Sequence, residues 1–365
     1  MQKSCFSYPV EFTADMFGES EVLAKTLRTA TGSEHPKTLI VADQNIVQHT
    51  EGLGAKIGRY VQEHGIQIAG NPVVMTGGER VKTDNLQSAL KVVSAILSAK
   101  LGRNDAVLAL GGGSVLDVAG YAAAQVRGGV KIVRLPTTPA AMVDGAFATY
   151  AAVDSASVKD ALRVPSVPAA VLIDTAFAST VLDGVWRSGF AEAMRFAVVS
   201  DAALVKKLVK LREAYCTRDA AALDELVRAV VASKAKKGLT DFGLWAPFRL
   251  QAMSGYKLPQ GYAVAMGVAV DLCYAAATGL LDADDRDTVL SALAQGGMLD
   301  GIRHSASFFA QTEELMRGLD AWALSTGQAA LTMPVALGKS KTVEMPDREA
   351  YAKVFKEILS LPPKA

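Results

Sequence analysis

Histidine is scarce in this chain of 365 residues. The four histidines are His35, His49, His64 and His304. Imidazole nitrogens are among the ligands that zinc and related transition metals favour. A chain with so few of them has few places where such a metal can bind.

Cysteine and long apolar runs are also lacking. The three cysteines, Cys5, Cys216 and Cys273, have no metal-binding or redox spacing, which indicates inert thiols in a reducing compartment. The first residues contain no apolar segment typical of a signal peptide. No apolar run approaches the roughly 18 residues that a membrane span needs. We therefore expect a cytoplasmic protein without a membrane partner.

Neither sign of charge dominates the composition. The chain carries 38 Lys and Arg residues against 37 Asp and Glu residues, which gives a formal net charge of +1. This balance gives no general attraction to nucleic acid or to an anionic membrane. The length is sufficient for roughly two domains with ample cores. We expect a small-molecule ligand and no nucleic-acid partner.

Three consecutive glycines mark the most informative stretch of the chain. A buried strand is predicted at Ala106–Leu110, followed by Gly111–Gly113, Ser114 and a helical pattern over Val115–Val126. Glycines here let the backbone approach a ligand closely, and the start of the helix offers free N–H groups to a phosphate. The spacing is not G-x-G-x-x-G. An ordinary tight strand–helix turn is the alternative interpretation.

The first half of the chain alternates between strand and helix patterns. Buried strands are predicted at Thr38–Ala42, Asn71–Met75, Ala106–Leu110, Lys131–Leu135 and Ala169–Ile173, and an opening strand is predicted at Phe6–Phe12. Intervening helical patterns favour a doubly wound parallel sheet. Asp43 follows one of these strands, where a carboxylate either meets a ribose hydroxyl or caps the next helix.

Long helical patterns dominate after residue 175. They cover Trp186–Ser200, Ala202–Ala214, Ala220–Lys236, Trp245–Met253 and Ala263–Thr278. We therefore predict an α/β fold with a doubly wound, Rossmann-like nucleotide-binding domain over residues 1–175 and a mostly α-helical domain over residues 176–365. Ligands of such sheets lie beyond the carboxyl ends of the strands, so we expect the site in a cleft between the domains.

Several collinear motifs resemble those of the 3-dehydroquinate synthase family, the sugar phosphate cyclases. They are Gly77–Lys82, Gly111–Asp117, Leu135–Thr138, Val143–Asp144, Ser188–Arg195, Asp241–Trp245 and Gly261–Ala265. The resemblance extends over essentially the whole chain. The opening segment Phe6–Phe17 and the Asp-Phe-Gly-x-Trp segment indicate a divergent branch rather than the shikimate-pathway enzyme.

The resemblance implies a bound NAD, a divalent metal, a phosphorylated sugar-like substrate and a homodimer. In the family, NAD oxidises one alcohol transiently, phosphate is eliminated, the ketone is reduced again and the ring closes by aldol chemistry. The positions that match the NAD contacts are Asp43, Asn45, Glu79, Lys82, Gly112, Gly113, Ser114, Asp117, Thr137, Thr138 and Thr180.

The family's metal ligands are not preserved. Glu192 matches the family's Glu, but Leu244 and Gln260 stand where the family has its two ligand histidines. A leucine has no lone pair to donate, and one carboxylate with one amide would hold zinc very weakly. We therefore predict that no divalent metal is tightly bound.

The positions that match the family's substrate contacts are partly preserved. Asp144 and Lys159 are kept, Asp160 replaces an Asn, and Arg195 replaces a Lys. Three further positions are assigned to the substrate, namely Lys237, Asp241 and Arg249. A solvated helix face is the alternative for the basic residues among them.

Asp144, Lys159, Glu192 and Arg195 are the candidate catalytic residues. Glu192 is either a general base with a pKa raised by burial or the partner of Arg195 in an i, i+3 ion pair. Two functions remain open. The first is metal-independent, NAD-assisted elimination, cyclisation or redox isomerisation of a phosphorylated polyol. The second is a non-catalytic homologue that binds NAD or a metabolite, or that pairs with an active homologue.

Overall fold

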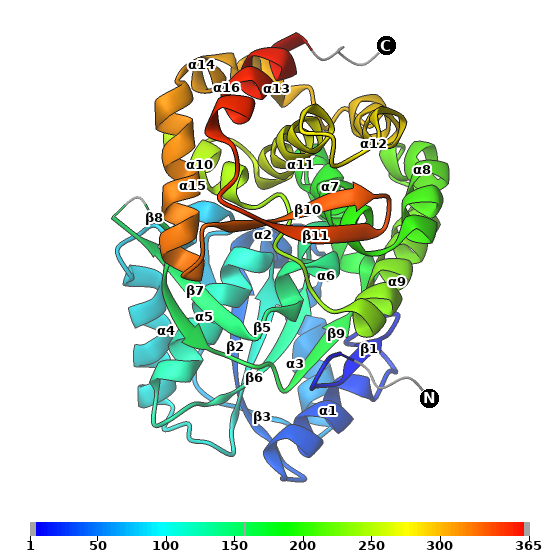
Figure 1. Cartoon of the computed structure of the whole chain (residues 1–365). Coiled ribbons are helices and arrows are strands. Elements are labelled where there is room, and N and C mark those ends of the chain that lie inside the picture. Colours follow the sequence, from blue (N-terminus) through cyan, green and yellow to red (C-terminus); the bar gives the residue numbers. More distant parts are fainter. Residues whose placement is uncertain (1–4, 157, 361–365) are drawn as a thin grey trace. The chain divides into compact units, whose positions relative to one another are not determined.

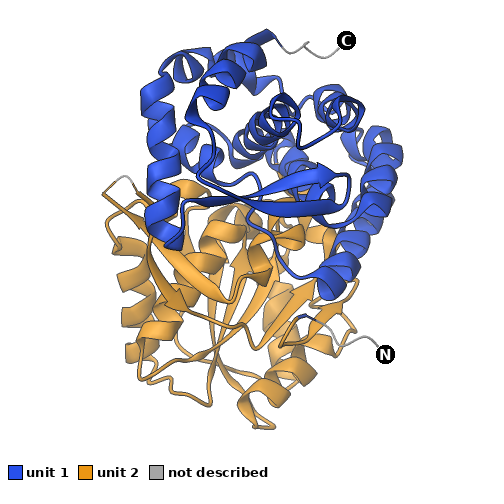
Figure 2. Cartoon of the chain, viewed as in Figure 1, with its two compact units in different colours: residues 1–5, 182–365 blue, residues 6–181 orange. Residues whose placement is uncertain are grey.

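The computed structural model describes residues 5–156 and 158–360 and divides the chain into two compact units. Unit 2 covers Phe6–Val181, and unit 1 contains Cys5 and the chain from Leu182 onward (Figure 2). The boundary between the units lies after the short 3-10 helix η3 (Thr175–Thr180), whereas the sequence pattern predicted it at residue 175. Asp174 caps η3 by accepting the N–H of Ala176 at 3.0 Å, which ties this helix to the end of the preceding strand in unit 2.

A parallel sheet forms the centre of unit 2. Its strands are β1 (Val10–Phe12), β2 (Lys37–Asp43), β3 (Gln67–Ile68), β4 (Val73–Met75), β5 (Ala106–Gly111), β6 (Lys131–Pro136) and β9 (Ala170–Ile173). Their order is β1-β9-β6-β5-β2-β3, with β4 also paired to β2. The central strands β5 and β9 are buried at every position, as their apolar runs predict.

Helices cover this sheet on both sides. They are α1 (Val22–Thr31), α2 (Gln44–His49), α3 (Leu53–Glu63), α4 (Gln87–Ser98), α5 (Gly113–Gln125) and α6 (Pro139–Val143), with the 3-10 helices η1 (Glu79–Lys82) and η2 (Gly145–Phe147). α4 and α5 lie on one side of the sheet and α1 and α3 on the other (Figure 1). The predicted doubly wound arrangement is therefore confirmed.

Two details of unit 2 differ from the sequence prediction or go beyond it. The opening strand is confined to Val10–Phe12, because only these residues pair with β9. An antiparallel hairpin, β7 (Tyr150–Ser155) and β8 (Val158–Pro165), follows η2. Most residues of β8 are at least partly exposed, so the strand lacks the apolar run that predicts a buried strand.

Unit 1 is mostly helical, as predicted. Its helices are α7 (Asp183–Ser200), α8 (Ala202–Cys216), α9 (Ala220–Lys237), α10 (Trp245–Met253), α11 (Gln260–Ala277), α12 (Ala283–Gln295), α13 (Gly301–His304), α14 (Ala306–Ala310), α15 (Thr312–Thr326), α16 (Arg348–Glu357) and the 3-10 helix η4 (Ile358–Ser360). One antiparallel hairpin joins β10 (Ala330–Ala336) to β11 (Lys339–Glu344).

Helices α7 and α11 form the core of unit 1. Both are buried along nearly their whole length, as helices apolar on every face must be. They approach so closely that a Cβ atom on Gly261 would lie 2.5 Å from the Cα atom of Ser188. This contact brings the start of α11 against the middle of α7, which carries Glu192 and Arg195. Among the described residues, no helix has the length and apolar character that crossing a bilayer requires.

Candidate functional site

The carboxyl ends of β2 and β5 form the natural ligand position of unit 2. From β2 the chain continues to β3 and β4 on one side, whereas β5 pairs with β2 on the other side. The strand order therefore reverses between β2 and β5. Ligands of open α/β sheets bind at such a reversal, beyond the carboxyl ends of the strands. Asp43 ends β2 and Gly111 ends β5 at this position.

The glycine turn has the geometry that approach of a phosphate requires. Gly112 is the N-cap residue of α5 and makes no side-chain cap, so the first turn of the helix keeps N–H groups available for a ligand. A Cβ atom on Gly111 would lie 2.7 Å from the Cβ atom of Val115, and one on Gly112 would lie 3.2 Å from Cγ2 of Thr138. A larger residue would therefore crowd this turn.

Asp43 is both a helix cap and a carboxylate beside the glycine turn. Its Oδ1 atom accepts the backbone N–H of Asn45 at 2.8 Å and the Asn45 side-chain amide at 3.1 Å. Burial raises the pKa of Asp43. Hydrogen bonds from Asn45 and from the backbone N–H of Gly112 lower it, but the effect of burial is larger. The bond from Gly112 places this carboxylate at the ligand position, so capping does not exclude a contact with ribose.

Glu79 links the glycine turn to the β7–β8 hairpin. Its Oε1 atom accepts the hydroxyl of Ser114 at 2.7 Å, and its Oε2 atom pairs with the ammonium group of Lys159. Burial opposes ionisation of Glu79, but Lys159 and Lys82 outweigh this effect and lower its pKa. The structure thus brings together three residues that lie 35 and 80 positions apart in the chain.

Lys82 lies between two carboxylates. Its Nζ atom donates to Oδ2 of Asp117 at 2.7 Å and to Oδ1 of Asp160 at 2.6 Å. Burial alone would lower the pKa of Lys82, but the two carboxylates raise it well above its usual value. This ion pair connects η1, α5 and the hairpin.

Asp154 belongs to the same group of charges and was not predicted from the sequence. It is 3% exposed and accepts the backbone N–H of Asp160 at 2.9 Å. Burial raises the pKa of Asp154. No motif marks this residue; an acidic side chain within an otherwise apolar strand, Ala151–Asp154, is the signal that could have identified it.

The remaining predicted residues of unit 2 lie after β6 and β9. Thr137 is buried, and its backbone N–H donates to Gly111 at 3.0 Å. The hydroxyl of Thr138 caps α6, and Asp144 follows that helix. Thr180 is exposed at the end of η3. Thr137 and Thr138 therefore flank the glycine turn directly, whereas Thr180 has no comparable contact with the described residues of the turn.

Glu192 and Arg195 form a buried ion pair in unit 1. Nε of Arg195 donates to Oε2 of Glu192 at 2.7 Å, and the two residues are only 1% and 4% exposed, respectively. A second guanidinium nitrogen donates to the carbonyl oxygens of Thr240 and Phe242, each at 3.0 Å. The i, i+3 pair expected as one alternative for Glu192 is therefore present in the structure.

The residues at the family's metal-ligand positions do not fit a zinc or cobalt ion. Leu244 is the N-cap residue of α10 and has no donor atom in its side chain. Gln260 begins α11, and its buried Oε1 atom has no hydrogen-bond partner in the described structure. Within the described ranges, no three His, Cys, Asp or Glu side chains come close enough to hold a metal. The absence of a tightly bound metal stays a prediction, and no chemical step is assigned to one.

Other residues assigned to the substrate have local roles in unit 1. Oδ1 of Asp241 accepts the hydroxyl of Thr332 at 2.6 Å, and Lys237 is exposed at the end of α9. Arg249 donates to the backbone carbonyl of Glu314 at 2.9 Å and pairs with its carboxylate. This pairing occupies donors that an anionic substrate would need.

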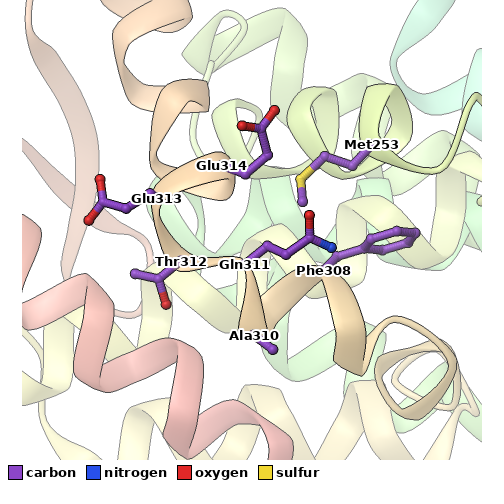
Figure 3. A pocket seen from close by; sticks show the side chains of 7 residues that line it. All are labelled: Met253, Phe308, Ala310, Gln311, Thr312, Glu313 and Glu314. Atoms are coloured by element: carbon purple, nitrogen blue, oxygen red, sulfur yellow. The ribbon is translucent and has the colours of Figure 1, made fainter.

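Glu314 also borders a pocket of about 610 Å³ at the start of α15. The lining residues come from the end of α10, from α14 and from the first turn of α15 (Figure 3). They are Met253, Phe308, Ala310, Gln311, Thr312, Glu313 and Glu314. None of the described lining residues is a predicted site residue, so the pocket adds nothing to the assignment of the site.

Two family models together match residues 72–317 of this chain. Residues 72–188 match the family model described as 3-dehydroquinate synthase N-terminal, and residues 189–317 match 3-dehydroquinate synthase C-terminal. A 3-dehydroquinate synthase from Bradyrhizobium sp. strain BTAi1 is 31% identical over 288 residues, which cover 74% of this chain and 72% of the relative. A second, from Shewanella halifaxensis, is 28% identical over 289 residues, or 76% of each chain.

The chain belongs to the 3-dehydroquinate synthase family. The resemblance inferred from the motifs is therefore confirmed.

Solved structures of sugar phosphate cyclases share the fold. A 2-epi-5-epi-valiolone synthase from Streptomyces hygroscopicus, with NAD+ and Zn2+ bound, has a TM-score of 0.82 at 22% identity and covers 96% of each chain. A 2-deoxy-scyllo-inosose synthase complexed with carbaglucose-6-phosphate, NAD+ and Co2+ has a TM-score of 0.70 at 17% identity, covering 97% of this chain and 99% of that one. At these identities the comparison establishes the fold alone.

Proposed function

We propose that this chain binds NAD at the glycine turn of unit 2 and uses it, without a divalent metal, to transform a phosphorylated polyol. The reaction class is elimination, cyclisation or redox isomerisation. The observation that carries the proposal is the turn itself, where Asp43, Gly112 and the start of α5 meet at the strand reversal. Structural relatives with NAD+ bound support the choice of cofactor.

The residues of unit 2 fit a dinucleotide. NAD, when bound, would supply reversible hydride transfer. The first N–H groups of α5 would hold its pyrophosphate, and the Asp43 carboxylate would accept a ribose hydroxyl. Glu79 and Lys82 are fixed by Ser114 and Asp117, so they would present oriented polar atoms rather than mobile side chains.

Charged residues that match the family's substrate contacts are assigned to the substrate. We assign Glu192 as the general base although it is paired with Arg195, because the guanidinium orients the carboxylate and favours its ionised form, which can accept a proton. Asp144, Lys159 and Asp160 are assigned to hydroxyl and phosphate groups of the substrate, in which a lysine supplies a donor to phosphate. Lys237 and Asp241 are assigned to the same substrate as further contacts.

Ordinary dehydroquinate synthesis is not expected from these residues. A metal that polarises the reacting oxygen stabilises the transition state by several kcal/mol. Since about 1.4 kcal/mol corresponds to a tenfold change in rate, its loss would slow the same reaction by orders of magnitude. A different reaction that needs less charge stabilisation is consistent with Leu244 and Gln260.

Calorimetry and a turnover assay test the proposal. We expect NAD to bind with an affinity in the micromolar range, and we expect elemental analysis to find no stoichiometric zinc or cobalt. We also expect purified protein with NAD and a chelator to convert at least one compound in a panel of sugar phosphates, detected by release of phosphate or by mass spectrometry of the product. Absence of NAD binding would remove the proposal, and a full equivalent of metal would remove its metal-independent part.

A non-catalytic homologue is the second candidate. The pairing of Arg249 with Glu314, together with the loss of both ligand histidines, favours it. NAD binding without turnover of any sugar phosphate would support this candidate. We expect a homodimer in either case, and analytical ultracentrifugation would measure it.

A further inference from the structure

The buried carboxylate of Glu192 already has a cation bound to it. The family resemblance assigns Glu192 to a metal, and two structural relatives have Zn2+ or Co2+ bound. In this chain, Nε of the Arg195 guanidinium lies 2.7 Å from Oε2 of Glu192. Burying a carboxylate is expensive unless an opposite charge accompanies it. The chain therefore meets this requirement with a residue of its own.

The guanidinium is fixed by more than its carboxylate partner. It also donates to the carbonyl oxygens of Thr240 and Phe242, in the loop that leads to Leu244. The same loop turns at Gly243, which has φ +68°. A Cβ atom at this position would lie 3.6 Å from Cγ of Arg195. The loop is thus folded closely around this side chain.

We propose that Arg195 replaces the metal as the cation bound by Glu192 and thereby excludes a divalent ion from unit 1. A metal bound by Glu192 would have to share the carboxylate with a buried guanidinium, so that either the two cations repel each other or the guanidinium is displaced and loses its counter-charge. Arg195 would therefore oppose metal binding even if ligands were present. Introducing histidines at positions 244 and 260 would not be sufficient for tight metal binding.

The planar fork of Arg195 is essential to this role. A guanidinium donates from several nitrogens in fixed directions, so it reaches Glu192 and the loop carbonyls together. A lysine carries a compact charge on a flexible chain and cannot make all of these bonds at once. If the proposed metal-independent chemistry is correct, on which this last point rests, Arg195 also supplies a fixed positive charge beside Glu192.

Cobalt binding tests the exclusion without an activity assay. The variants are Leu244→His/Gln260→His and the same pair combined with Arg195→Lys. Cobalt is titrated into full-length protein, and visible absorption reports coordination by imidazole and carboxylate. We expect the triple variant to bind cobalt about 10- to 100-fold more tightly, the range by which neighbouring groups alter metal affinity.

A matched control uses another arginine of α7. Arg187 donates to the backbone carbonyl of Gly296 and does not contact Glu192 among the bonds of the described structure. Arg187→Lys in the two-histidine background should leave the cobalt affinity unchanged. NAD titration and thermal melting of every variant establish that both units remain folded.

The outcomes distinguish failure of this inference from failure of the proposed function. If the two-histidine variant binds cobalt as tightly as the triple variant, or if the triple variant binds none, Arg195 is not the excluding residue. If the unaltered chain binds a full equivalent of cobalt, the metal-independent function fails as well. Should the triple variant not fold, comparing Gln260→His with Arg195→Lys/Gln260→His makes the same test with fewer changes.

Discussion

At the scale of single residues, burial decides what the charged side chains can do. Asp43, Lys82, Glu192, Arg195 and Asp271 are all less than 8% exposed. A charge in such surroundings requires a partner or a shifted pKa. Two of these residues give clear expectations in solution.

Asp43 should select NAD over NADP. Its carboxylate would repel a 2′-phosphate, and Asp43→Asn removes that charge while keeping an oxygen that can cap α2. We expect NAD affinity to fall about tenfold or more, since a hydrogen bond to a charged group contributes roughly 1.5–3 kcal/mol. Discrimination against NADP should fall as well, and calorimetry with both dinucleotides measures the two effects.

Asp174→Asn is the matched control for Asp43→Asn. Asp174 directly follows strand β9 and likewise caps a helix of the same unit. An equal loss of NAD affinity in both variants would contradict the assignment of Asp43 to the ribose.

Asp271 should make stability depend on pH. This residue is 1% exposed and accepts hydrogen bonds from Trp245 at 2.9 Å and Tyr351 at 2.8 Å. Burial raises its pKa from 3.8 to about 7. The folded state therefore binds a proton that the unfolded state has lost between these values, so the free energy of unfolding falls as the pH rises through this window.

Asp271→Asn should abolish this contribution, because an amide does not titrate but keeps an acceptor oxygen. Urea unfolding at about pH 5 and about pH 8 should show a smaller change for the variant than for the unaltered chain. Asp284→Asn removes an exposed carboxylate of the same unit and serves as the control. A pH response in Asp271→Asn equal to that of the unaltered chain would show that another group is responsible.

At the scale of elements, the strand–glycine–helix unit of β5 and α5 is the most informative. Helix α5 follows the buried strand β5 directly and has no side-chain cap. The N–H groups of its first turn therefore stay available for a ligand. Three residues in succession lack the Cβ atom that would stand between a ligand and the backbone.

Gly113→Ala should weaken NAD binding without weakening the fold. The added Cβ atom would lie 3.9 Å from the Cα atom of Gly145, an ordinary contact, and alanine favours the helix. The same methyl group would stand where a phosphate approaches, so we expect a loss of about tenfold in NAD affinity. Calorimetry and thermal melting measure the two quantities.

Gly54→Ala provides the comparison within the same unit. Gly54 lies in the first turn of α3, and a Cβ atom there would meet nothing within 4 Å. Unchanged NAD binding in Gly113→Ala would make the glycine turn a structural feature only.

At the scale of the whole molecule, the candidate residues divide between two units of different architecture. The residues assigned to NAD lie in unit 2, whereas Glu192, Arg195, Leu244 and Gln260 lie in unit 1. All three tryptophans, Trp186, Trp245 and Trp322, also belong to unit 1. Tryptophan fluorescence therefore reports changes in unit 1. Changes in unit 2 are measured by hydrogen exchange of its peptides.

NAD should stabilise unit 2 by mass action. At 100 times its dissociation constant, a ligand specific for the folded state contributes about 2.7 kcal/mol. We expect slower amide exchange in the segments after β2, β5 and β6, measured by mass spectrometry. Protection confined to peptides of unit 1 would refute the location of the NAD site.

The sequence by itself determined the features that depend on neighbouring residues. Strands β2, β5, β6 and β9 were predicted from apolar runs, because a strand buried on both faces is apolar throughout. Helices α7 to α11 were predicted from helical periodicity, because a helix buried along one stripe repeats its apolar residues at that spacing. The glycine turn was found from the order of residues alone. The prediction that Leu244 and Gln260 hold no metal needed only the family's motifs in addition. The exposed strand β8 has no such signature and was not predicted.

Only the tertiary structure decided which charges meet. Lys82 and Asp160 are 78 positions apart, and Asp271 and Tyr351 are 80 apart, so no local pattern can pair them. The bonds from Arg195 to the carbonyls of Thr240 and Phe242 likewise depend on how the loop before α10 packs against α7. Ion pairs and buried hydrogen bonds are formed when packing removes water, and that packing is a property of the folded chain rather than of any segment.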